Sequence, residues 1–126
     1  MITLGKIENS AIKYQTNDQN IVNEYFQHLF LSNFYQNKNA KNIFFKGGTA
    51  LRLVYNSPRY SEDLDFSSGK LRGSQIEKIL LETFVVIEKE GIEIKLIEAK
   101  ETTGGYLGII KLKDDKYSSR LKLEIS

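Results

Sequence analysis

Two stretches of the chain repeat apolar residues at the spacing of an amphipathic α-helix. The first begins near Asp18, a favourable N-cap residue, and its apolar positions are Ile21, Val22, Tyr25, Phe26, Leu29, Phe30 and Phe34. The second runs over residues 74–90, ends at Gly91, and its apolar positions are Ile76, Ile79, Leu80, Phe84 and Ile87. Each stretch therefore predicts a helix that buries one apolar face.

Shorter apolar runs have the pattern of β-strands. Residues 43–45 form a compact apolar run that stops at Gly47-Gly48, and a helical pattern follows over residues 49–55 until Pro58 and its neighbours end it. The pattern of polar and apolar positions predicts four more strands, at residues 63–66, 92–97, 106–112 and 121–125. The expected fold class is α+β, with a mixed β-sheet flanked by helices, and not a doubly wound sheet.

Composition narrows the possible functions. The 126 residues fit one domain, and 18 basic against 16 acidic side chains exclude a strongly basic, histone-like binder. The absence of cysteine excludes disulfides, thiolate zinc sites and a cysteine nucleophile, and the single histidine, His28, is expected to be structural. No apolar run approaches the roughly 20 residues of a membrane helix and no secretory signal is visible, so we expect a soluble cytoplasmic protein without a membrane partner.

The first candidate for chemistry is the run from Lys46 to Thr49. A predicted strand ends there, two glycines turn the backbone and a helix begins, so that free N–H groups and the helix dipole would favour an anion such as phosphate. Glycines let that anion approach the main chain closely, and the Thr49 hydroxyl could cap the helix or donate to a phosphate oxygen. Lys46 precedes the glycines, so this is not a Walker loop. Taken alone, the run also fits a plain tight turn.

The second candidate is a pair of acids. Asp63 and Asp65 lie two residues apart in a predicted strand, so both carboxylates leave one face while Leu64 and Phe66 enter the core. Two such charges repel unless a cation intervenes, and hard oxygen ligands suit Mg²⁺ or Mn²⁺. A solvated acidic turn is the alternative. Arg59 and Ser61 lie in the loop before the pair and could face an anion there.

A third acid, Glu124, shares one face of the last predicted strand with Arg120 and Lys122. If this strand lies beside the one carrying Asp63 and Asp65, Glu124 completes a three-carboxylate metal cluster. Two divalent ions about 3.5–4 Å apart could then activate a hydroxyl and stabilise a leaving pyrophosphate. A solvent-facing glutamate on an edge strand is the alternative interpretation.

These residues carry a resemblance to a known family. The run KGGTALRLVYNSPRYSEDLDF, residues 46–66, resembles the signature of the nucleotidyl transferase AbiEii/AbiGii toxin family, a branch of the polymerase β-like nucleotidyltransferases. The residues that match are Gly47, Gly48, Thr49, Asp63 and Asp65. The strand around Glu124 resembles the family's third-acid strand, although that superfamily more often has aspartate there.

The resemblance implies a polymerase β-like fold over residues 1–126 and transfer of a nucleoside monophosphate from an NTP to an acceptor hydroxyl. Asp63, Asp65 and Glu124 would be catalytic and hold Mg²⁺ or Mn²⁺, and the residues expected to bind the nucleotide are Lys46, Gly47, Gly48, Thr49, Arg59 and Ser61. It also implies the toxin of a toxin–antitoxin or phage-defence system, with a cognate antitoxin and, in some members, tRNA as the acceptor.

Two features leave an alternative open. The family normally continues into a largely helical region, which we expect to be absent here, and the last predicted strand runs into Ser126 without a turn or cap, as in the front part of a longer protein. The alternatives are a non-catalytic module of the same fold that binds nucleotide, RNA or protein, and an α+β domain in which the acidic strand is only surface.

Overall fold

A computed structural model describes residues 18–55 and 63–126 and contains a five-stranded mixed sheet with the order β1-β2-β5-β4-β3. The strands are β1 (Phe44–Lys46), β2 (Asp63–Ser67), β3 (Glu93–Thr102), β4 (Gly105–Lys113) and β5 (Ser118–Ile125). All neighbours pair antiparallel except β2 and β5, which run parallel. The α+β fold class predicted from the sequence is therefore confirmed.

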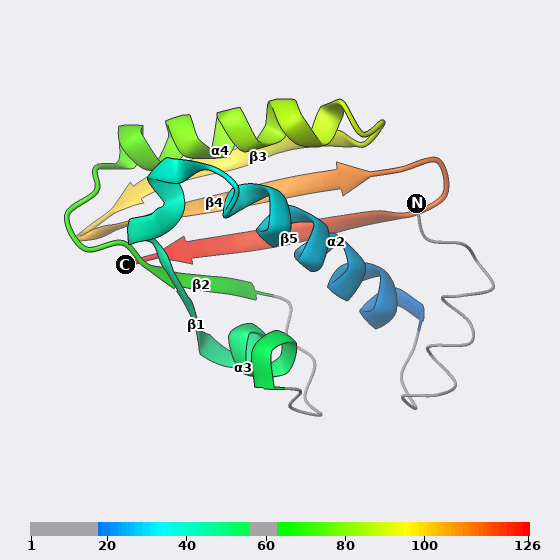
Figure 1. Cartoon of the computed structure of the whole chain (residues 1–126), viewed down its shortest axis with the longest axis horizontal. Coiled ribbons are helices and arrows are strands. Elements are labelled where there is room, and N and C mark those ends of the chain that lie inside the picture. The colour runs from blue at the N-terminus through cyan, green and yellow to red at the C-terminus, as the bar shows by residue number, and fades with distance from the viewer. Residues whose placement is uncertain (1–17, 56–62) are drawn as a thin grey trace.

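Four helical segments of the described residues accompany the sheet. They are α2 (Asp18–Phe34), the 3-10 helix η1 (Lys38–Asn42), α3 (Gly47–Tyr55) and α4 (Gly73–Glu88). Figure 1 shows α2 and α4 over the same face of the sheet, while α3 lies at the end that carries β1 and β2. None of the helices in the described part of the chain is long and apolar enough to span a membrane.

The core lies between the sheet and the pair α2–α4. Phe26 and Phe30 of α2 and Leu80 and Ile87 of α4 are fully buried, as their helical spacing predicts. Phe66 of β2 is fully buried too, and its ring lies 5.6 Å from that of Phe34 and 5.4 Å from that of Phe45. This aromatic cluster joins α2, β1 and β2, so the short strand β1 is anchored by side chains more than by its length.

Several boundaries differ from the prediction. Strand β1 is shifted by one residue from 43–45, and α3 begins at Gly47 instead of Thr49, so the two glycines form its first turn. Helix α4 ends at Glu88 with Lys89 as its C-cap, so Gly91, with φ 86°, lies beyond the cap. Strand β3 continues to Thr102 past an irregularity between Leu96 and Glu98, which is typical of a β-bulge.

The second face of the sheet, which we call the open face, carries mainly polar and charged side chains. Burial alternates strictly along β5, where Leu121, Leu123 and Ile125 enter the core while Arg120 and Glu124 are exposed. The same alternation along β2 buries Leu64 and Phe66 and directs Asp63 and Asp65 to the open face, as predicted. All three candidate acids therefore lie on the face opposite α2 and α4.

Candidate active site

The junction of β1 and α3 forms one wall of the site. Lys46 ends β1 and Gly47 begins α3 with no residue between them. Gly47 has a φ of 85°, and a Cβ at this position would lie 2.5 Å from Oδ2 of Asp65. Glycine is required here for two reasons, because other residues rarely adopt this φ and because the Asp65 carboxylate fills the space of a side chain. The first turn of α3 thus lies directly against a carboxylate, which the helix dipole favours.

Strand pairing brings the three acids together. In the parallel pair β2–β5, Asp65 lies opposite Glu124 and Asp63 lies opposite Lys122. The condition on which the sequence-based metal site depended, adjacency of these two strands, is therefore met. Asp63 and Asp65 are half-buried, whereas Glu124 is exposed.

The carboxyl group of Asp65 has a perturbed pKa. Its pKa is raised, first by burial, then by the negative charges of Glu124 and Asp63 and by a hydrogen bond with Glu124, while Lys46 acts in the opposite direction. Because the carboxylates of Asp63, Asp65 and Glu124 repel one another, a proton or a metal cation beside Asp65 is favoured.

Two lysines border the acids. Lys46 lies opposite Asp65 in the β1–β2 pair, and its Nζ donates a hydrogen bond to Oγ of Ser126 at 2.9 Å. Lys122 Nζ lies 3.1 Å from Oε1 of Glu124, and this hydrogen bond and the charge of Glu124 raise the pKa of Lys122. Lys46 thus has a neutral partner that orients it, whereas Lys122 neutralises part of the charge of Glu124.

Thr49 has a contact that the sequence did not indicate. Its side chain is fully buried, and its hydroxyl donates a hydrogen bond to the backbone carbonyl of Asp63. The sequence suggested that this hydroxyl caps α3 or faces a ligand. In the structure it does neither, and instead it links α3 to the start of β2. Gly47 and Gly48 are exposed, so their main chain remains accessible.

A pocket of about 370 Å³ opens at this point of the molecule. Its lining includes four of the predicted residues, Lys46, Gly47, Asp65 and Glu124, together with Thr102, Tyr106, Leu107, Ile125 and Ser126. Asp63 lies on the same face but does not line the pocket. Arg59 and Ser61 lie outside the described residues, so their nucleotide-binding role stays a prediction.

The described acids do not converge into a three-ligand metal site. Within residues 18–55 and 63–126, no group of three or more Asp, Glu or His side chains is placed to hold a metal ion. The donor chemistry nevertheless fits a divalent cation, because Asp65 and Glu124 are hard oxygen ligands that lie against each other at the pocket.

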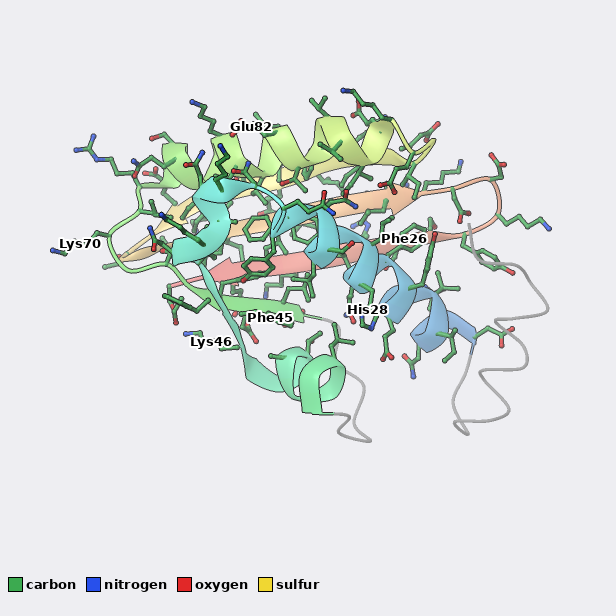
Figure 2. The ribbon with its side chains drawn as sticks, in the orientation of Figure 1. Phe26, His28, Phe45, Lys46, Lys70 and Glu82 are labelled. Atoms are coloured by element: carbon green, nitrogen blue, oxygen red, sulfur yellow. The ribbon has the colours of Figure 1, made fainter. Side chains whose placement is uncertain are left out.

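Sequence reasoning missed five residues of the pocket, and Ser126 and Tyr106 are the two of them whose side chains make hydrogen bonds. Ser126, which holds Lys46, gave no signal beyond a hydroxyl after the last strand residue. Tyr106 was noted only as a strand residue, yet its hydroxyl donates to Oε2 of Glu77 at 3.3 Å, and burial together with Glu77 raises its pKa to about 12. His28 is exposed on α2, apart from Lys46 (Figure 2).

Comparisons with known proteins point to one class of enzyme. The family model described as "Nucleotidyl transferase AbiEii toxin, Type IV TA system" matches residues 29–126. Two solved structures are similar over 87% of this chain, with 27% sequence identity and a TM-score of 0.52: a protein from H. pylori described as a candidate nucleotidyltransferase and JHP933 from Helicobacter pylori. The chain spans 46% and 44% of their lengths, respectively. Among curated proteins, no significant match is found.

Proposed function

Since the chain belongs to the AbiEii nucleotidyl transferase toxin family and has the polymerase β-like fold of that class, we propose that its pocket binds an NTP and transfers the nucleoside monophosphate to an acceptor hydroxyl. The acceptor oxygen forms a bond to the α-phosphorus, the bond from that phosphorus to the β-phosphate oxygen breaks, and pyrophosphate leaves. The supporting observation is the alignment of Asp65 with Glu124 across β2–β5, beside Lys46 and Gly47.

The residues have distinct proposed roles. The exposed main chain of Gly47 and Gly48, at the start of α3, and the ammonium group of Lys46 hold the β- and γ-phosphates. Arg59 and Ser61, which follow in the sequence, contribute further phosphate contacts. Glu124 accepts the proton that the acceptor hydroxyl loses. Thr49 acts indirectly, because its hydrogen bond to Asp63 sets the position of α3 relative to the acids.

Asp63, Asp65 and Glu124 would hold Mg²⁺ or Mn²⁺ together with the phosphates. The bound cation supplies positive charge that offsets the negative charge of the triphosphate and of the leaving pyrophosphate. The three acids would hold this positive charge close to the first turn of α3, where the free backbone N–H groups point.

The family assignment also supports biological proposals. We propose that residues 1–126 form the catalytic domain, that the protein acts in the cytoplasm as the toxin of a toxin–antitoxin or phage-defence system, and that a cognate antitoxin restrains it. The acceptor is proposed to be a nucleic-acid hydroxyl, with tRNA as the first candidate.

Calorimetric titration with each NTP, with and without Mg²⁺, tests the site. Binding is expected to require Mg²⁺ and to be lost in the double variant Asp63→Asn with Asp65→Asn. A matched control is Glu93→Gln with Glu98→Gln, which removes two exposed acids of β3 instead. If the aspartate variant binds NTP as tightly as the unaltered protein does, the assignment of the site is wrong.

A non-catalytic binding module is the second candidate, favoured by the absence of a convergent three-acid group among the described residues. Incubation of the protein with labelled NTPs, Mg²⁺ and total tRNA separates the two functions. Label incorporated by the unaltered protein and not by Asp65→Asn supports the transferase. NTP binding without any incorporation supports the module.

A further inference from the structure

Three basic residues form a continuous row across the open face. Lys95 of β3 lies directly opposite Lys111 of β4, and Lys111 lies directly opposite Arg120 of β5. Each is next to a core residue in its strand, as Lys95 is to Ile94. All three side chains therefore project from the open face into solvent. With strands about 4.8 Å apart, this basic row is about 10 Å long.

The basic row is unusual for this sheet. The next two rows toward the site contain both acidic and basic residues. Across the strands, one row consists of Glu98, Ile109, Lys122 and Asp63. The other consists of Lys100, Leu107, Glu124 and Asp65. In the basic row only cations face one another. Among the described residues no ion pair or hydrogen bond links Lys95, Lys111 or Arg120 to an acid, although Glu93 and Glu98 flank Lys95 along β3.

Like charges directly opposite in a sheet destabilise it. The pairing of these three side chains with one another is therefore unfavourable in the folded protein, and an anion that lies on the row would relieve the repulsion. The spacing suits a linear polyanion, because three cations in line can each meet one of a succession of phosphates.

Position relates the row to the pocket. Arg120 and Glu124 lie on the same face of β5, about 13 Å apart at roughly 3.3 Å per residue. Because α2 and α4 cover the other face, a large acceptor reaches Asp65 and Glu124 from the open face (Figure 1). A nucleic-acid strand carries both features that this face calls for, a terminal hydroxyl and a phosphate chain leading away from it.

We propose that Lys95, Lys111 and Arg120 bind the phosphate backbone of a nucleic-acid acceptor whose terminal hydroxyl lies at Asp65 and Glu124. This inference rests on the proposed transferase function and adds to it the surface that holds the acceptor. Since the contacts are to phosphates, the row positions the strand without reading its sequence.

The test measures binding of a fluorescein-labelled RNA hairpin with a single-stranded 3′ tail, by anisotropy over a range of NaCl concentrations. The triple variant Lys95→Gln, Lys111→Gln and Arg120→Gln is expected to bind at least about tenfold more weakly at low salt. Its slope of log affinity against log salt is expected to fall by about 2, at about 0.7 per phosphate contact of a single strand.

The control removes the same charge elsewhere. Lys38→Gln, Lys41→Gln and Lys89→Gln alter three exposed lysines of η1 and the end of α4, and this variant is expected to bind RNA within twofold of the unaltered protein. Thermal unfolding is expected to show the row variant at least as stable as the unaltered protein, because a repulsion is removed.

Three results would overturn the proposal: unchanged RNA binding by the row variant, equal loss in the control, or displacement of the RNA by polyglutamate at matched charge, which would assign the row to an acidic protein. Calorimetry of Mg²⁺ and NTP with the row variant keeps the two proposals apart. If the unaltered protein does not bind NTP, the proposed transferase function is wrong. If NTP binds but the triple variant binds RNA as the unaltered protein does, only the proposed role of the basic row is wrong.

Discussion

At Gly47, the backbone and a carboxylate occupy the space that a side chain would need. The positive φ of this residue and its approach to Asp65 both follow from the direct passage of β1 into α3. The sequence indicated the need for glycine but assigned it to the approach of a ligand. It could not reveal that part of the space is taken by the protein's own acid, since that depends on the pairing of β1 with β2.

Gly47→Ala is expected to be destabilising and to weaken NTP binding, because the new methyl group displaces the Asp65 carboxylate. Gly104→Ala is the matched control, since Gly104 has a similar φ of 80° and open space around it. Both variants should lose about 1–2 kcal/mol of unfolding free energy from backbone strain. Only Gly47→Ala should lose Mg²⁺-dependent NTP affinity in calorimetry; equal binding by both variants would contradict this role.

Tyr106 gives the protein a dependence on alkaline pH. Burial and Glu77 raise its folded-state pKa to about 12, whereas the unfolded chain titrates near 10. Between these values the unfolded state has lost the proton that the folded state keeps, so stability falls as pH rises above about 10. Melting temperatures from pH 8 to 11 should therefore fall less steeply for Tyr106→Phe than for the unaltered protein. Parallel curves would show that this group does not titrate as described.

Among the elements, α3 shows what periodicity can and cannot predict. Alternation predicted β2 and β5 and the faces of their residues, because burial on one side of a sheet imposes a period of two. The predicted start of α3 was wrong by two residues, and the hydrogen-bond partner of Thr49 was not predicted. Local spacing does not say which strand a helix packs against. Strand β3 was predicted too short because its bulge interrupts the alternation on which the prediction relied.

The contact between α3 and β2 is expected to depend on the Thr49 hydroxyl. Thr49→Val keeps the shape of the side chain but leaves the carbonyl of Asp63 without its partner, which should cost about 1–3 kcal/mol. Thr49→Ser keeps the hydroxyl and should retain most of the stability of the unaltered protein, apart from the smaller loss due to a buried methyl group. Urea unfolding of both variants measures the difference, and equal stability of Val and Ser would argue against the hydrogen bond.

For the molecule as a whole, stability is unevenly distributed across the sheet. Strand β4 is paired along both edges, whereas β1 has only three residues, pairs along one edge and exposes 64% of Phe44. The pocket lies between these extremes, since Lys46 comes from β1 and Glu124 from β5.

Hydrogen exchange should reflect this difference. Amides of β4, such as those of Ile110 and Leu112, are expected to exchange only through global unfolding, and those of Phe44 to Lys46 through local opening. NTP with Mg²⁺ should slow exchange in β1 more than in β4, because ligand contacts are added at Lys46 and Gly47. Uniform protection across the five strands would contradict the expectation.

The parallel pairing of β2 with β5 has a consequence for biosynthesis. All of α4, β3 and β4 lie between these strands in the chain, so Asp65 has no Glu124 beside it until residue 124 has been synthesised. The contact between these two acids is therefore among the last of the described sheet to form on a growing polypeptide.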